Sequence, residues 1–118
     1  MPNMNYQRGY RLEHAAQKLL EANGYKVMRA HASKGETDLM AVSPSNKLLV
    51  QCKKTTKDDI RVYDLEPIIR ESEKAGAIPL LVYSFLYSPV YAKTITSGKM
   101  AVRKDENHVT LEEYLSFI

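Results

Sequence analysis

The chain has 118 residues, of which 44% are hydrophobic and 26% charged, a balance typical of one folded domain and unlike that of a disordered segment. No apolar run approaches the roughly 20 residues that span a bilayer, and the N-terminal segment lacks the apolar core of a secretory signal. Cys52 is the only cysteine, which excludes an intrachain disulfide and a cysteine-based zinc site. We therefore expect a single domain over residues 1–118, in a reducing cytoplasm and without a membrane partner.

The net charge of +3 is divided unevenly along the chain. Residues 1–61 hold 11 Lys/Arg against 6 Asp/Glu, and residues 62–118 hold 6 against 8. A basic first half and an acidic second half indicate one face for a polyanion and another for packing or partners. Ordinary solubilising surface charge is the alternative, and charge alone does not decide between them.

The first predicted element is a helix over about residues 6–23, which Gly24 can end in the left-handed conformation. Its apolar residues follow the three-and-four spacing of one buried stripe: Leu12, Ala16, Leu19 and Leu20. Hydrophobic and turn patterns then predict, in chain order, a strand over 25–30, a turn over 31–36, a hairpin of strands 37–42 and 47–53 around a turn at 43–46, and a polar stretch at 54–59.

The second half of the chain continues the alternation of helices and strands. The patterns predict a helix over 64–75, a buried strand over 78–85 that contains Pro79 near its edge, and weaker strands over 90–95 and 100–103. Asp64 is the expected cap of this helix, Gly76 its end, and Thr110 with Glu113 matches a capping box that starts a short C-terminal helix. Helices on both sides of a central mixed β-sheet make an α/β domain.

The predicted hairpin places chemically distinctive side chains on one face of the sheet. Alternate strand residues share a face, so Gln51 and Lys53 point the same way as Leu49. If the hairpin pairs in register near its open end, Asp38 faces the same side. Glu13 lies one residue off the helix stripe, at the rim of its buried face, and can reach the same sheet edge. Metal-assisted phosphodiester cleavage needs such oxygen ligands for Mg²⁺ and a cation near the nucleophile.

This order of residues resembles the PD-(D/E)xK nuclease pattern, with Glu13, then Asp38 in ETDLMAV, then QCK at 51–53. The segments RGYRLEHAAQKLLEANGYKVMRAHASKGETDLMAV and LLVQCKKT, followed by a basic loop and AGAIPLLVYSF, resemble archaeal and archaeal-virus Holliday junction resolvases over about residues 8–86. The likeness is specific because the acidic helix residue, the VMRA strand, the turn of small residues and the strand that carries the lysine all occur in this order. It implies a restriction-endonuclease-like fold and a homodimer whose two active sites cut opposite strands of a four-way DNA junction, in the cytoplasm of a prokaryotic cell or a virus-infected host.

The resemblance also implies roles for individual residues. Glu13, Asp38 and position 51 hold Mg²⁺, for which Mn²⁺ can substitute, and the backbone carbonyl of Cys52 is a further ligand. Lys53 assists attack on the scissile phosphate. The family has glutamate at position 51, whereas this chain has Gln51. An amide oxygen can ligate Mg²⁺ but brings no negative charge and no bidentate carboxylate, so we expect weaker metal binding and slower cleavage.

Basic residues flank the predicted site and favour a phosphate-binding track. By the resemblance, Arg29 and Ser33 serve the DNA backbone and the active site, and a salt bridge from Arg29 to Glu13 or Asp38 is equally open. Each of the remaining members is an ordinary surface charge by itself, but together they indicate DNA binding: Arg8, Arg11, Lys34, Lys54, Lys57 and Arg61.

Three tyrosines flank the apolar strand, and we expect Tyr83, Tyr87 and Tyr91 to pack in the core or in a dimer interface. Since no aromatic residue accompanies the basic ones, binding of single strands by base stacking is not expected. Three functions remain open: a Mg²⁺-dependent endonuclease that resolves four-way junctions, a junction-binding module that does not cleave because of Gln51, and a PD-(D/E)xK nuclease with another DNA substrate. Restoring glutamate at position 51 separates the first two, and a comparison of junction with linear duplex separates the third.

Overall fold

The computed structural model describes residues 4–29 and 37–118, with side chains from residue 11 onward. Its elements follow the predicted alternation of helices and strands. In chain order they are α1 (Met4–Ala22), β1 (Lys26–Arg29), β2 (Leu39–Val42), β3 (Lys47–Lys54), β4 (Asp59–Val62), α2 (Glu66–Ala75), β5 (Ile78–Ser84), β6 (Tyr91–Thr94), β7 (Met100–Arg103) and α3 (Leu111–Phe117).

A five-stranded mixed sheet forms the centre, in the order β1-β2-β3-β5-β6. The β3–β5 pair is parallel and the other neighbours are antiparallel. The predicted hairpin is confirmed as β2–β3, with Leu39 opposite Val50 and the backbone N–H of Ser43 donating to the Asn46 carbonyl at 2.8 Å. Strands β4 and β7 form a separate two-stranded ribbon.

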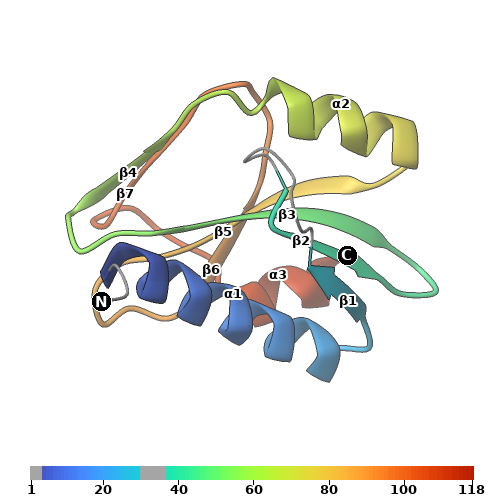
Figure 1. Cartoon of the computed structure of the whole chain (residues 1–118), viewed down its shortest axis with the longest axis horizontal. Helices are drawn as coiled ribbons and strands as arrows, with labels where there is room; N and C mark the ends of the chain where they lie inside the picture. The colour runs from blue at the N-terminus through green and yellow to red at the C-terminus, as the bar shows by residue number, and fades with distance from the viewer. Residues whose placement is uncertain (1–3, 30–36) are drawn as a thin grey trace.

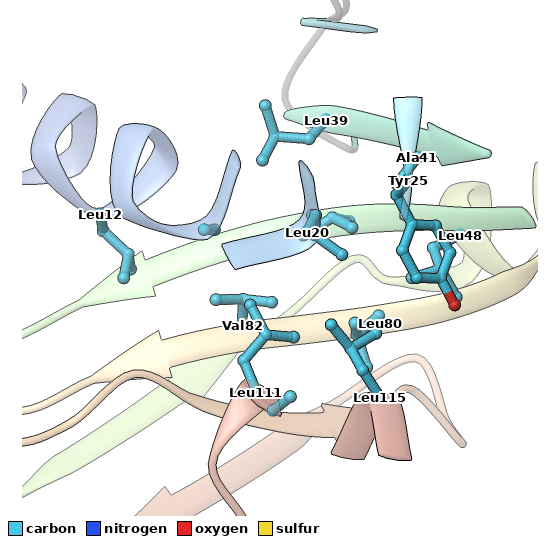
Figure 2. Packing of buried hydrophobic residues seen from close by; sticks show 13 residues of the cluster. Leu12, Leu20, Tyr25, Leu39, Ala41, Leu48, Leu80, Val82, Leu111 and Leu115 are labelled. Atoms are coloured by element: carbon cyan, nitrogen blue, oxygen red, sulfur yellow. The ribbon is translucent and has the colours of Figure 1, made fainter. Parts of the chain in front are cut away.

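Helices cover both faces of the sheet, as Figure 1 shows, with α1 and α3 on one side and α2 on the other. The alternation of strand residues divides the core accordingly, because successive side chains point to opposite faces. Val50 and Val82 belong to the cluster under α1 and α3, whereas Leu49 and Leu81 belong to the cluster under α2 and the β4–β7 ribbon. Figure 2 shows part of the first cluster, with Leu12, Leu20, Leu80, Val82, Leu111 and Leu115 gathered together. The predicted α/β class is confirmed.

Helix boundaries agree with the sequence except at the start of α2. Gly76 ends α2 with φ 64°, and Thr110 caps α3 through the complete capping box with Glu113, both as predicted. The prediction of Asp64 as a cap is wrong, because α2 begins at Glu66 after Leu65 and no side chain caps it. Leu65 is only 2% exposed, so burial of this leucine positions the helix start where a capping side chain was expected.

The aromatic residues around β5 do not all behave as expected. Tyr83 and Phe85 are buried in the cluster under α2, and the Tyr91 ring lies 5.6 Å from that of Tyr83. Tyr87 is 97% exposed, so of the two expectations for it, packing in the core is wrong and a place in a dimer interface stays a prediction. None of the helices in the described part of the chain is long and apolar enough to cross a bilayer.

Candidate active site

Asp38 lies where strand β2 begins, and β3 fixes it through both main chain and side chain. Its backbone N–H donates to the Val50 carbonyl at 2.7 Å, one residue beyond the Leu39–Val50 pair. Its Oδ2 accepts a hydrogen bond from the Cys52 backbone N–H at 2.7 Å. Leu39 and Val50 are the last backbone pair of β2 and β3 at this end. Beyond them, the Asp38 carboxylate takes over as the hydrogen-bond acceptor for the Cys52 amide.

The surroundings of Asp38 bring four predicted site residues together electrostatically. Burial raises the pKa of the Asp38 carboxyl above its ordinary 3.8, and the Glu13 carboxylate raises it further. The hydrogen bond from the Cys52 amide and the charges of Lys53 and Arg29 act in the opposite direction. The geometry agrees: Glu13 pairs with Arg29, Arg29 is opposite Leu39, and Asp38, just before Leu39, accepts from the Cys52 amide. These residues, from α1, β1, the start of β2 and β3, therefore share one end of the sheet.

Glu13 and Arg29 form an ion pair between α1 and the last residue of β1. Leu12, the residue before Glu13, is 3% exposed, and this anchored neighbour places Glu13 at the rim of the buried helix face as predicted. The Glu13 side chain is 22% exposed and that of Arg29 31%. Of the two interpretations that the sequence left open for Arg29, the structure therefore contains the salt bridge to Glu13.

Gln51 and Lys53 project from β3 on the same face as Leu49, as the alternation predicts. Gln51 is 6% exposed, whereas Lys53 is exposed. Because Leu39 is opposite Val50, the next pair along the strands would set Asp38 against Gln51. An uncharged amide in this buried position avoids the cost that an isolated buried carboxylate carries.

Cys52 points to the opposite face of β3 and packs against the cluster under α1. Burial raises the pKa of its thiol well above the ordinary value, and the carboxylates of Asp38 and Glu13 add to this effect. The thiol is therefore a packing group, and only the main chain of Cys52 serves the site, with its amide held by Asp38.

The donor set fits a hard divalent cation, although it is poor in charge. Within residues 11–29 and 37–118, no three His, Cys, Asp or Glu side chains gather in a way that could hold a metal ion. Among the described residues, Glu13 and Asp38 bring carboxylates to this end of the sheet. The Gln51 amide oxygen and the Cys52 carbonyl are the further ligands that the sequence predicts. Mg²⁺ commonly uses one or two carboxylates together with waters and substrate phosphates, and this is the kind of donor set that these residues offer.

The structure describes the side chains of some of the predicted DNA-binding residues. Arg11, Lys54 and Lys57 are exposed, as the track requires. Arg61 is exposed as well, but it forms an ion pair with Asp59 on β4, with Nε 3.2 Å from Oδ2. The Arg8 side chain and residues Ser33 and Lys34 lie outside the described part of the structure.

Two features of this end of the sheet were not predicted from the sequence. One is the bond between the Asp38 carboxylate and the Cys52 amide, which depends on where the β2 ladder stops. The other is the exposure of Tyr87, for which the only signal was its place in the turn-forming residues SFLYSP before Val90.

The chain is similar to known proteins in sequence and in fold. A family model described as archaeal Holliday junction resolvase (hjc) matches residues 4–116. The crossover junction endodeoxyribonuclease Hjc of Methanocaldococcus jannaschii is 35% identical over 82 residues, which are 68% of this chain and 61% of that protein, so the chain spans less than two thirds of this relative. The solved structure of Archaeoglobus fulgidus Hjc, a Holliday junction resolvase from an archaeal hyperthermophile, matches with a TM-score of 0.78 at 14% identity, over 92% of this chain and 96% of that one. At this identity the structural match shows the fold alone.

Proposed function

Since the chain belongs to the archaeal Holliday junction resolvase family, we propose that it is a structure-selective, metal-dependent endonuclease that binds and nicks four-way DNA junctions. It acts in the cytoplasm of a prokaryotic cell or a virus-infected host, in DNA recombination and repair. The single observation that supports this most strongly is the meeting of Glu13, Asp38 and Lys53 at one end of the sheet.

Each residue of this site has a role that follows from its environment. Glu13 and Asp38 would hold Mg²⁺, with Gln51 and the Cys52 carbonyl as supplementary oxygen donors. When bound, the ion supplies positive charge against the charge that develops on the scissile phosphate. The Asp38 carboxylate is oriented beforehand by the Cys52 amide, and Glu13 by its ion pair with Arg29.

Lys53 supplies the cation that the reaction needs beside the phosphate. It is exposed, and it is close enough to Asp38 to lower the pKa of that carboxyl. An ammonium so placed interacts with the attacked phosphate and with the group that attacks it, which favours cleavage because the transition state gathers negative charge there.

Gln51 supports a second candidate function, a junction-binding module that cleaves slowly or not at all. Replacing one of three carboxylates by an amide removes a charge that would balance Mg²⁺, while leaving the surface that binds DNA unchanged. A PD-(D/E)xK nuclease with a different DNA substrate is the remaining alternative, and no observation at the site favours it.

A cleavage assay with a labelled four-way junction and Mg²⁺ tests the proposal, with Gln51→Glu run beside the unaltered protein. We expect junction binding by both proteins and faster cleavage by Gln51→Glu, because the added carboxylate strengthens metal binding. Binding without cleavage by either protein would favour the binding module. A preference for linear duplex over the junction would favour the alternative substrate.

We also propose that the protein works as a homodimer, because two opposed nicks need two active sites at a fixed spacing and a two-fold assembly suits a four-way junction. The apolar strand β5 is excluded as the interface by its burial, since Leu80, Leu81 and Val82 are each 0% exposed. Light scattering at micromolar concentration tests the assembly, and a monomer both with and without DNA would contradict it.

A further inference from the structure

The turn between β5 and β6 presents one tyrosine almost entirely to solvent. The Tyr87 side chain is 97% exposed, and its backbone has φ 60°, in the left-handed region that bulky residues rarely occupy. The neighbouring Leu86 is also exposed, at 40%. Exposure of a large aromatic ring to water is unfavourable, and so is its left-handed backbone conformation. Residues with strained backbone conformations are concentrated at functional sites.

The exposure of Tyr87 is imposed by a well-defined turn. The Phe85 N–H donates to Ser88 Oγ at 2.8 Å, and the Ser88 N–H donates to the Phe85 carbonyl at 3.1 Å. The adjacent aromatic residues turn inward, with Tyr83 and Phe85 buried and their rings close to His108. The chain therefore buries the two rings that precede the tip of the turn and exposes the ring at the tip.

This turn follows the end of the strand that lies beside the candidate active site. Strands β3 and β5 are parallel, and Lys54 and Ser84 form their last register pair. The Thr55 N–H donates to the Ser84 carbonyl at 3.2 Å, which continues the contact past the strand ends. Tyr87 is three residues beyond Ser84, so its Cα lies within about 11 Å of that strand end. Tyr87 and Lys53 thus belong to the same end of the sheet.

We propose that Tyr87 stacks on an unstacked nucleobase at the branch point of the DNA junction. This inference rests on the proposed function and assigns one surface residue to the recognition of branched DNA. At a branch point base stacking is interrupted, and an aromatic ring can stack on any exposed base because every base has a π-face. Contacts of this kind read the shape of DNA and not its sequence, which suits a structure-selective enzyme.

The surroundings of Tyr87 favour DNA over a second protein chain as the occupant. A stable protein interface buries about 800 Å² on each partner, far more than one turn of the chain offers. The last register pair before the turn carries the exposed Lys54, a cation suited to phosphate. An exposed ring at the same end of the sheet as an exposed lysine is the combination used by proteins that bind unstacked bases. The fold thus brings together an aromatic and a basic residue that the sequence pattern kept apart, which changes the expectation that base stacking plays no part.

A junction carrying 2-aminopurine at the branch point tests the proposal, because the fluorescence of this base changes when its stacking changes. We expect a fluorescence change with the unaltered protein and with Tyr87→Phe, which keeps the ring, and its loss with Tyr87→Ser. Tyr87→Ser should also bind the junction about tenfold more weakly, while its affinity for linear duplex is unchanged. Tyr63→Ser is the matched control, since Tyr63 is 58% exposed but lies between β4 and α2.

The outcomes separate this inference from the proposed function. If the unaltered protein binds the junction and Tyr87→Ser gives the same fluorescence and affinity, the inference is overturned and the proposed function stands. If Tyr87→Ser weakens self-association and leaves the fluorescence change intact, the ring belongs to a protein interface and the inference also falls. If the unaltered protein has no preference for the junction, both fall together.

Discussion

At the scale of single residues, the partly buried carboxylate of Asp38 lowers the folding stability of the protein. Its carboxyl is partly buried beside Glu13, which raises its pKa, and the ionised form is disfavoured in the folded protein. A raised pKa in the folded state contributes stability that is fully present below the ordinary value of 3.8 and is lost as the pH rises through the raised value. Near neutral pH the ionised Asp38 therefore weakens the metal-free fold.

Replacing this carboxylate gives a prediction with two independent readouts. Asp38→Asn should abolish cleavage and leave junction binding nearly intact, because the proposed role of Asp38 is to hold the metal and not to contact the DNA. Without metal, it should also melt at a higher temperature than the unaltered protein at pH 7, and this difference should shrink as the pH falls toward 3.8. Melting curves in a metal chelator test the second part, with Asp58→Asn on the exposed β3–β4 connection as control. Undiminished cleavage in Asp38→Asn would remove this residue from the site.

The sequence predicted which side chains share a face of the sheet better than it predicted which side chains are in contact. Strand alternation correctly grouped Gln51 with Lys53, because a period of two leaves no other arrangement. It could not decide the partner of Arg29, since that depends on the separation of α1 and β1 in space. The exposure of Tyr87 was also beyond it, because Tyr83, Tyr87 and Tyr91 are the same residue type and only the turn geometry tells them apart.

At the scale of elements, local signals succeeded where the determining contacts are local. The capping box at Thr110 and the left-handed glycine at 76 act within one helical turn, and both were visible in the sequence. Strand β4 was missed because its partner β7 lies about forty residues later, with Asp59 opposite Arg103. The start of α2 was misplaced for a similar reason, since Leu65 is fixed by burial among residues distant in sequence.

The capping box gives a prediction about stability alone. Thr110→Ala removes the hydroxyl that accepts from the Glu113 N–H at 3.1 Å, and it should lower the free energy of unfolding by about 1 kcal/mol. Helix α3 contributes the buried Leu111 and Leu115 to the cluster under α1, so the loss should be felt by the whole domain. Denaturant unfolding measures it. Junction affinity should not change, and a large fall in affinity would mean that α3 takes part in binding.

At the scale of the whole molecule, the uneven charge of the chain should govern its affinity for DNA. If the basic residues around the sheet end form a phosphate track, binding is driven by counterion release and falls steeply with salt. The logarithm of the affinity should then fall with the logarithm of the salt concentration by about 0.9 per phosphate neutralised. A slope near zero would mean that the basic half of the chain is ordinary surface charge.

Lys57 and Arg61 allow this track to be tested by residue. Lys57→Ala should reduce the salt slope by about one unit without changing the preference for junctions, because a phosphate contact carries no shape information. Arg61→Ala should do the same if Arg61 leaves its ion pair with Asp59 on binding DNA. An unchanged slope in Arg61→Ala beside a reduced one in Lys57→Ala would show that the pair with Asp59 persists in the complex.

The hydrogen bond from the Cys52 amide to Asp38 offers a way to detect the proposed metal from the main chain of β3. Only Oδ2 of Asp38 is used by this amide, so the second oxygen can coordinate a cation while the bond persists. Magnesium bound there would draw electron density from the carboxylate and alter the magnetic environment of the Cys52 amide proton. In an NMR titration without DNA, the chemical shift of the Cys52 amide proton should therefore change as Mg²⁺ is added. The change should level off once the site is filled, although no cleavage takes place. The occupancy of the site would then be read from the backbone, separately from catalysis.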